Sequence, residues 1–203
     1  MYIYWLGESS FKIKTDRATI IIDPSDKKTG LSQSALAGDI IVISHTLETD
    51  AARVSPLEEK QFIVSSPGEY ETREVFIYGH TGKNNTVLYL IKADQISFAL
   101  LAGVYEALED KALELFEGAD IAATPVGGNG VLSGKLADTV ISQIEPRIVI
   151  PMNFAIPKLI LKRDPIDVFL KEMGIPAQQS EKSLYITKDK LPGDEMRVVL
   201  LSP

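Results

Sequence analysis

The sequence predicts a single α/β domain built from mixed β-sheets with helices on the outside. Short apolar runs bounded by turn residues fill the first half of the chain, a pattern typical of strands. In the second half, apolar strands alternate with segments that have a helical repeat. This order indicates sheets covered by helices. With 203 residues and no linker-like or low-complexity segment, we expect one domain, residues 1–203.

The first half begins with a predicted hairpin. Residues 2–6 are mostly aromatic or β-branched, residues 7–10 form a turn, and residues 11–15 alternate apolar with polar side chains. Pro24 ends a third strand, because proline cannot donate a hydrogen bond to a neighbouring strand. This third strand and the later ones in this half are expected at residues 18–23, 40–44, 61–65, 74–79, 86–92 and 96–101.

The second half predicts helices between strands. The first helix has apolar side chains at helical spacing with acids on the opposite face, and Gly118 ends it. Pro146 stops the second helix, and Pro165 opens the third at its first turn. The helices are expected at residues 105–117, 137–144 and 165–173, and the strands at residues 121–125, 148–152, 184–187 and 196–200.

The composition of the chain argues against several classes of partner and cofactor. The formal net charge is −7 and no Lys/Arg cluster interrupts it, so the sequence predicts no nucleic-acid partner and no membrane surface. The chain has no cysteine, which excludes disulfides, thiolate zinc sites and cysteine nucleophiles. The N-terminus lacks the features of a signal peptide, and no apolar run approaches the ~20 residues that span a bilayer. A cytoplasmic location is therefore expected.

The stretch most indicative of function is the strand at residues 40–44 with the polar loop after it. Four β-branched residues lead into Ser44 and His45, and two carboxylates follow at Glu48 and Asp50. A loop at the end of a rigid strand is a common place for chemistry. Because His45 is one of only two histidines in the chain, the central question is whether this loop binds a metal.

Several segments together resemble the metallo-β-lactamase superfamily, in particular its branch of zinc-dependent hydrolases similar to L-ascorbate-6-phosphate lactonases. The segments are residues 3–11 (IYWLGESSF), 20–24 (IIIDP), 39–45 (DIIVISH), 67–71 (PGEYE), 85–91 (NTVLYLI), 125–128 (PVGG) and 145–154 (EPRIVIPMNF). The resemblance covers most of the chain. It implies a four-layer αββα sandwich, in which two mixed β-sheets face each other, helices lie on the outer faces and the site lies at one edge.

The resemblance also implies a site that holds zinc or manganese, where the metal lowers the pKa of a bound water toward ~7 and creates a hydroxide nucleophile. His45 matches the first metal ligand of the family. In the same loop, Leu47 and Asp50 stand where the family has histidines, and Thr49 stands where it has an aspartate. Elsewhere, Glu8 replaces an N-terminal histidine, Gly103 replaces the bridging aspartate, and Asn153 replaces the last histidine. His80 is the candidate for the remaining histidine.

These replacements keep the family's scaffold and remove most of its metal donors. Leu47 cannot bind a metal, Gly103 cannot bridge two metals, and Asn153 offers only a carbonyl oxygen. We therefore expect no cofactor, with His45 and Asp50 as the residual metal candidates. The candidates for a vestigial pocket are Glu8, His45, Leu47, Glu48, Thr49, Asp50, Glu69, His80, Gly103 and Asn153.

Most of these candidates also have simpler interpretations. His45 is interpreted as a strand-end histidine that hydrogen-bonds Ser44 or the backbone, and the acids after it as solvated loop residues. Glu8 either pairs with His45 in the old pocket or is a plain turn residue. Glu69 belongs to a turn, His80 to an exposed loop, and the glycine loop at residues 127–130 to a flexible rim.

Three hypotheses follow. The first is a catalytically degenerate protein that binds a small molecule or a protein partner. The second is a metal-dependent hydrolase with an altered or mononuclear zinc or manganese site, built from His45, Asp50, Glu8 and His80, acting on a lactone, a phosphoester or a similar substrate. The third is a structural or homo-oligomeric module whose old pocket is filled by side chains. An open polar cleft near His45 and Asn153 favours ligand binding, and an apolar plug built on Leu47 favours the structural role.

Overall fold

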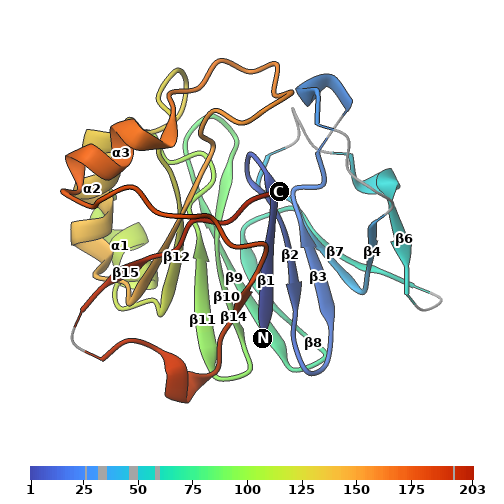
Figure 1. Cartoon of the computed structure of the whole chain (residues 1–203). Coiled ribbons are helices and arrows are strands. Elements are labelled where there is room, and N and C mark those ends of the chain that lie inside the picture. Colours follow the sequence, from blue (N-terminus) through green and yellow to red (C-terminus); the bar gives the residue numbers. More distant parts are fainter. Residues whose placement is uncertain (26, 32–35, 46–49, 58–59, 194) are drawn as a thin grey trace.

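The chain folds into two β-sheets that pack face to face, with helices along one side (Figure 1). The structure is a computed structural model of residues 1–203, and it describes all of them except residues 26, 32–35, 46–49, 58–59 and 194. The predicted sandwich of two mixed sheets is confirmed.

The first sheet has the strand order β14-β1-β2-β3-β5-β7. Its strands are β1 (Tyr2–Gly7), β2 (Ser10–Lys14), β3 (Thr19–Ile22), β5 (Ile40–Val42), β7 (Phe62–Val64) and β14 (Leu184–Tyr185). β2 runs antiparallel to β1 and β3, whereas β3, β5 and β7 are parallel. The carboxyl ends of β1, β3, β5 and β7 therefore lie at one edge of the sheet.

The second sheet has the order β15-β13-β12-β11-β10-β9-β8. Its strands are β8 (Gly68–Thr72), β9 (Val75–Thr81), β10 (Val87–Ala93), β11 (Ile96–Leu100), β12 (Ile121–Pro125), β13 (Ile148–Met152) and β15 (Arg197–Val198). β8 to β11 are antiparallel neighbours, and β11, β12, β13 and β15 are parallel. The predicted order, in which successive strands are followed by strands that alternate with helices, is thus present in this sheet.

The main core lies between the two sheets, because each strand turns alternate side chains inward. Large residues from both sheets are fully buried in it, including Trp5, Phe11, Tyr89 and Phe98. The rings of Phe11 and Phe98 meet edge to face with centroids 5.6 Å apart, which ties β2 to β11 across the sandwich.

A second, smaller core covers part of the outer face of the first sheet. The strands β4 (Leu36–Gly38) and β6 (Val54–Pro56) form a two-stranded parallel sheet. Their Leu36 and Val54 pack against Ile21 and Ile41, the outward residues of β3 and β5. β3 and β5 are therefore buried on both faces, which explains why their sequences are continuous apolar runs.

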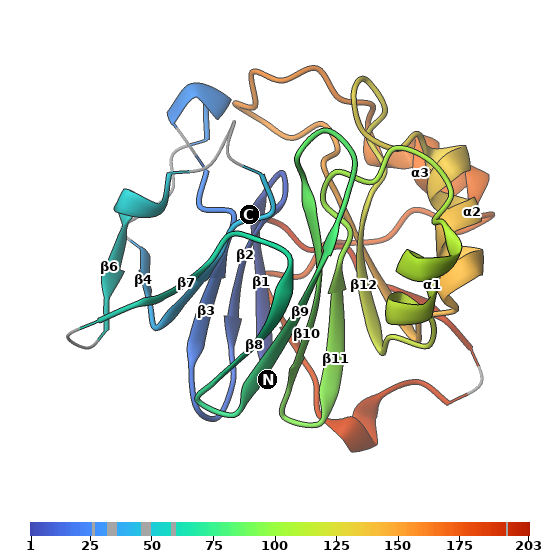
Figure 2. The same cartoon turned by 180° about the vertical axis from the view of Figure 1, so that it is seen from behind.

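The helices gather beside the second sheet (Figure 2). They are α1 (Asp110–Phe116), α2 (Gly134–Ile144) and α3 (Ile166–Glu172), and α2 packs against β12 and both other helices. Short 3-10 turns occur at η1 (Lys27–Thr29), η2 (Ala51–Arg53) and η3 (Lys188–Lys190). None of the described helices is long and apolar enough to cross a membrane.

Two helix boundaries differ from the prediction for local reasons. The first helix begins at Asp110, not at residue 105, because the backbone of Leu108 is held by the side chain of Gln143 through both its N–H and its carbonyl. The second helix begins earlier than predicted, at Gly134, because the Ser133 side chain caps it by accepting from the Leu136 N–H.

Candidate functional site

Glu8 lies in a tight turn at the carboxyl end of β1. Gly7 and Glu8 both have positive φ, at 100° and 49°, and a β-carbon on Gly7 would collide with the Leu31 side chain. The Trp5 indole N–H donates to the Glu8 carbonyl at 2.7 Å and fixes the turn. The turn thereby directs the Glu8 carboxylate into the protein, where the residue is 3% exposed.

The Glu8 carboxylate is bound by two side chains from distant parts of the chain. The Asn153 amide donates to its Oε2 at 3.0 Å, and Asn153 follows β13 directly. Arg163 donates to the same oxygen from Nη2 at 2.7 Å and from Nε at 3.2 Å. The side chains of Glu8 and Arg163 are only 4% and 9% exposed, so this is a buried, hydrogen-bonded ion pair. We call Glu8, Asn153 and Arg163 the buried triad.

The loop between β13 and α3 holds Arg163 in place. The Arg163 Nη1 donates to the Asn129 carbonyl at 2.9 Å, and the backbone N–H of the next residue, Asp164, donates to the Gly127 carbonyl at 2.7 Å. The Asn129 amide donates in turn to the Asp164 carboxylate at 3.2 Å. The glycine loop at residues 127–130, interpreted from the sequence as a flexible rim, is thus tied to the segment that carries the arginine.

Close backbone approach explains the glycine at position 127. A β-carbon there would overlap the Asn153 carbonyl, so a larger residue would push the two loops apart. On the other side, the Ile160 N–H donates to the Thr29 carbonyl at 2.9 Å. The loop from β13 to α3 therefore joins the loop after β3 over the turn that carries Glu8 (Figure 1).

His45 belongs to a different group of polar side chains at the same edge. The Ser44 N–H and hydroxyl donate to the two oxygens of Asp23 at 2.7 and 2.5 Å. The Ser44 hydroxyl also lies 3.2 Å from His45 Nδ1, which is 3.6 Å from the Asp23 carboxylate. Asp23 follows β3, and Ser44 follows β5 by two residues, so the parallel pairing of these strands brings the group together.

This group does not have the geometry of a nucleophilic triad. In such a triad the imidazole stands between the hydroxyl and the carboxylate. Here the Ser44 hydroxyl stands between Asp23 and His45, and Ser44 is 1% exposed. The serine therefore orders the strand end and is not presented to a substrate.

Tyr89 closes the same region from the second sheet. Its hydroxyl donates to the Ile43 carbonyl at 3.1 Å, so β10 is hydrogen-bonded to the end of β5. Burial, and then the negative charge of Asp23 and the nearby Tyr70, raise the pKa of the Tyr89 phenol. The phenol is thus a stable hydrogen-bond donor at physiological pH.

Gly103 marks the position where the family resemblance places a bridging aspartate. Its φ is 79°, a conformation that favours glycine. A β-carbon at this position would lie 2.7 Å or less from the β-carbon and both γ atoms of Thr86. The backbone therefore leaves no room for a metal-bridging side chain.

The other predicted residues do not converge on the buried triad. Asp50 donates its N–H to the Pro24 carbonyl at 2.8 Å and precedes η2. The predicted turn at Glu69 and the predicted exposed loop at His80 are wrong, because β8 and β9 pair as a hairpin: Glu69 is exposed on the edge strand β8, and His80 is half-buried near the end of β9. His80 and Gly103 both line a cavity of about 130 Å³ beside the β9–β10 hairpin. Leu47, Glu48 and Thr49 lie outside the described residues.

Of the predicted pocket residues, the structure therefore joins Glu8 to Asn153 and places His45 with Asp23. The proposed pairing of Glu8 with His45 is replaced by two separate groups. Among the residues that the structure describes, no three His, Asp or Glu side chains are arranged as metal ligands would be. With Glu8 neutralised by Arg163 and Asn153 donating its amide N–H, these residues do not fit the family's dinuclear metal site.

Sequence reasoning missed Arg163 and did not single out Asp23 or Tyr89. Asp23 carried a signal, because it ends an apolar strand of the family signature. Arg163 carried none, since it lies 155 positions from Glu8 in a loop without a motif.

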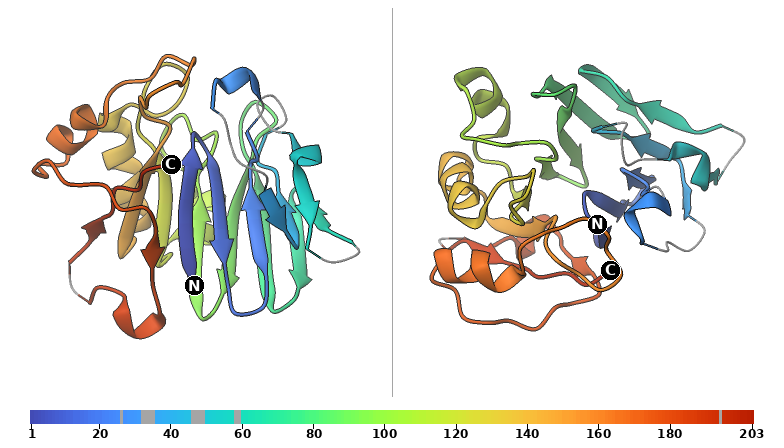
Figure 3. Two further views of the ribbon diagram at one scale, coloured as in Figure 1. Left: turned by 45° about the vertical axis from the view of Figure 1, so that its right-hand side comes forward. Right: turned by 90° about the horizontal axis from the view of Figure 1, so that it is seen from above.

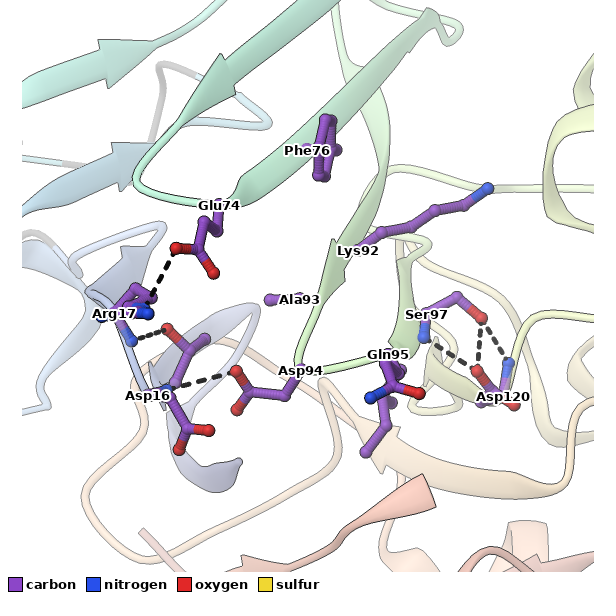
Figure 4. A pocket seen from close by; sticks show the side chains of 12 residues that line it. Asp16, Arg17, Glu74, Phe76, Lys92, Ala93, Asp94, Gln95, Ser97 and Asp120 are labelled. Carbon is purple, nitrogen blue, oxygen red and sulfur yellow. Dashed lines mark hydrogen bonds and ion pairs between the residues drawn. The ribbon is translucent and has the colours of Figure 1, made fainter. Parts of the chain in front are cut away.

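A larger cavity lies at the opposite end of the sandwich (Figure 4). It has a volume of about 850 Å³ and is formed by three hairpin turns and adjoining strands. Arg17 pairs with Glu74 at 3.1 Å, and the Asp16 N–H donates to Asp94 at 3.2 Å. Arg17 and Glu74 thus neutralise each other, and none of the predicted pocket residues lines this cavity.

Comparison with known proteins places the chain in a group of similar folds. The family described as "β-lactamase superfamily domain" matches residues 2–153. A protein of Thermotoga maritima, provisionally described as a Zn-dependent hydrolase of the metallo-β-lactamase superfamily, has a similar structure, with a TM-score of 0.83, 22% identity and full coverage of both chains.

Two more distant structures show the same fold. A metallo-hydrolase of Ignicoccus hospitalis has a TM-score of 0.67 and 18% identity, with 92% of this chain and 99% of that chain covered. An isothiocyanate hydrolase from Delia radicum gut bacteria has a TM-score of 0.63 and 16% identity, with coverage of 92% and 100%. No match was found among curated proteins.

Proposed function

Because the chain belongs to the metallo-β-lactamase superfamily, we propose that it acts by binding a ligand or a partner and is not a zinc hydrolase. The buried triad carries this proposal. By the family resemblance, Glu8 and Asn153 stand where two metal ligands would be, and here both are bonded to each other while Arg163 supplies the positive charge.

A guanidinium in this place opposes metal binding in two ways. Its fixed charge repels a divalent cation, and it occupies the lone pairs of the only carboxylate in the buried triad. The hydrogen bonds of the neighbouring loops keep Arg163 from swinging away, since Asn129 and Gly127 bind it and the residue next to it. The pocket is therefore filled by a polar plug made from the chain itself.

Because this plug fills the old pocket, we expect the protein to act through its surface. A pocket that is filled by a satisfied ion pair offers little room for a small substrate, whereas the scaffold around it remains rigid. Of the three hypotheses from the sequence, the geometry supports a degenerate scaffold that works through contacts with a partner.

Metal analysis of the purified protein tests this proposal. The chain is expressed without an affinity tag that binds metal, purified without chelator, dialysed and measured for zinc, manganese and iron. We expect less than a tenth of an equivalent of each. Hydrolysis of a lactone, a phosphodiester and a thioester is then measured with wild type and His45→Ala.

The alternative is a metal-dependent hydrolase with an altered site. The closeness of His45 and Asp23 favours it, together with the hydrolases among the similar structures. About one equivalent of zinc or manganese, with turnover that His45→Ala abolishes, would establish the alternative and refute the binding proposal.

A further inference from the structure

One half of the outer face of the first sheet carries neither helix nor strand cover in the described part of the chain. β4 and β6 lie over β3 and β5 only, and Figure 3 (left) shows β1 and β2 unobstructed beside them. The uncovered half presents the residues Tyr2, Tyr4, Lys12, Lys14, Tyr185 and Lys190. We call these six residues the tyrosine–lysine face.

Strand register brings these side chains into neighbouring positions. Tyr2 is paired with Tyr185 on one side and with Lys14 on the other, while Tyr4 is paired with Lys12. Paired residues point to the same side of a sheet, and so do residues two apart on one strand. The rings of Tyr2 and Tyr185 touch with centroids 4.5 Å apart, and these residues are 44% and 46% exposed.

The face is positively charged in a protein of net charge −7. Lys190 places its ammonium 4.6 Å from the Tyr185 ring centre, and Lys14 places its own 6.0 Å from the ring centre of Tyr4. Partial burial and then the charge of Lys14 lower the pKa of Lys12, so these two amines repel each other. No outward position of β1, β2 or β14 is acidic. An anion on this face would relieve that repulsion.

We propose that the tyrosine–lysine face binds a single-stranded nucleic acid, with phosphates against the lysines and bases against the tyrosines. Sheet faces with exposed aromatics among basic residues suit single strands, because unpaired bases stack on the rings while the backbone follows the charges. This inference goes beyond the proposed function and does not depend on the buried triad.

Other occupants fit the face less well. A second copy placed by a two-fold axis would bring the same lysines face to face, which like charges disfavour. A flat sheet face offers no groove for an amphipathic helix. The sequence-based expectation of no nucleic-acid partner rested on the net charge of the whole chain. At physiological ionic strength, however, charges more than ~8 Å away are largely screened, so the lysines of this face determine whether a nucleic acid binds there.

Fluorescence anisotropy of 5′-labelled dT12 and rU12 at 50 mM NaCl tests the proposal. We expect Lys14→Glu to weaken binding at least tenfold and to reduce the salt dependence by about one counterion. Tyr2→Ala and Tyr185→Ala each remove a stacking ring and should weaken binding roughly 5- to 100-fold. Tyr185→Phe should retain binding, because it keeps the ring.

Lys111→Glu on α1 is the matched control, since it reverses an exposed lysine away from this face and should leave the affinity unchanged. Circular dichroism of each variant confirms folding. The proposal is overturned if wild type does not bind either oligonucleotide, or if Lys111→Glu weakens binding as much as Lys14→Glu. It is also overturned if the same residues bind polyglutamate or vesicles of anionic lipid while ignoring the oligonucleotides.

Discussion

At the scale of single residues, Arg163 supplies the positive charge that faces the buried carboxylate of Glu8. A buried carboxylate needs a positive partner, because leaving it alone in a low-dielectric interior is costly. In this chain that partner is a side chain, and it is available in every folded molecule. The stability of the fold therefore depends on this ion pair.

Removal of Arg163 alone should therefore be much worse than removal of both charges. We expect Arg163→Met to lower the free energy of unfolding by ~3–5 kcal/mol, because it strands the Glu8 carboxylate. The double variant with Glu8→Gln should recover much of that loss. Urea unfolding of the two single variants and the double variant measures the coupling between them.

The exposed pair of Arg197 and Glu181 is the matched control, with a similar distance of 3.1 Å. Arg197→Met should cost less than about 1 kcal/mol, because both side chains are solvated. Additive effects of Glu8→Gln and Arg163→Met would show that the buried ion pair does not act as a unit.

Restoring a family ligand at position 103 should fail for steric reasons. Gly103→Asp forces a side chain into Thr86 at a φ of 79°, so we expect a loss of about 2–4 kcal/mol in stability. Thermal and urea unfolding give the value, and Thr86→Gly in the same chain should restore part of it. A Gly103→Asp variant as stable as wild type would show that the loop can rearrange to admit the side chain.

The residues of the site were only partly predictable. Glu8 and Asn153 could be singled out because they stand at recognisable positions of a family signature. Their mutual contact, and the role of Arg163, depend on a loop that crosses from the second sheet to the first, and no local pattern encodes such a contact. The exclusion of a side chain at Gly103 likewise depends on Thr86, which is distant in sequence.

At the scale of elements, the order of strands and helices could be predicted from local sequence patterns. The elements that cover the outer faces of the sheets could not. Most strands of the main sandwich are apolar runs with clear turns, so periodicity located them, whereas the polar edge strand β8 lies where the sequence predicted a turn. β4 and β6 are three-residue strands in polar stretches of the sequence, and they form because Leu36 and Val54 pack against Ile21 and Ile41. Such short strands depend on tertiary contacts more than on propensity.

The start of β12 is anchored by Asp120, which predicts a dependence on pH. Burial alone would raise the pKa of this carboxyl, but hydrogen bonds from the Ser97 N–H and hydroxyl and the ammonium of Lys188 hold it below its usual value. A carboxyl with a lowered pKa in the folded state stabilises the protein above its unfolded pKa of ~3.9. That stabilisation disappears as the pH falls through the folded-state pKa.

Asp120→Asn should thus cost about 1 kcal/mol at pH 7, and the difference from wild type should shrink as the pH falls below about 4. Urea midpoints measured from pH 7 to pH 2 give the comparison. Asp138→Asn, an exposed change on α2, is the control for the loss of one charge. A gap between Asp120→Asn and wild type that stays constant with pH would contradict this assignment.

At the scale of the whole molecule, the last part of the chain joins the two sheets. β14 pairs with β1 at the edge of the first sheet, and β15 pairs with β13 at the edge of the second. The Glu181 N–H donates to the Leu200 carbonyl at 2.8 Å, so the two ends of this segment also bind each other. The edges of both sheets are therefore covered by one continuous segment, which also supplies Tyr185 and Lys190 to the tyrosine–lysine face.

Deletion of residues 181–203 should accordingly abolish cooperative folding. The segment buries six aliphatic side chains, namely Leu184, Ile186, Val198, Val199, Leu200 and Leu201. At ~1.5–3 kcal/mol for each, their burial contributes roughly 9–18 kcal/mol, which is comparable to the whole stability of a typical domain. We expect the truncated chain to lose its near-ultraviolet circular dichroism and its sigmoidal urea transition.

Leu184→Ala calibrates this expectation, because it removes one of the six side chains and should cost about 2–5 kcal/mol while cooperative unfolding persists. If the truncated chain unfolds cooperatively with near-normal stability, the two sheets hold together through their shared core alone. In that case β14 and β15 only cover edges. Loss of both the cooperative urea transition and the near-ultraviolet circular dichroism would instead show that the two sheets need residues 181–203 to fold.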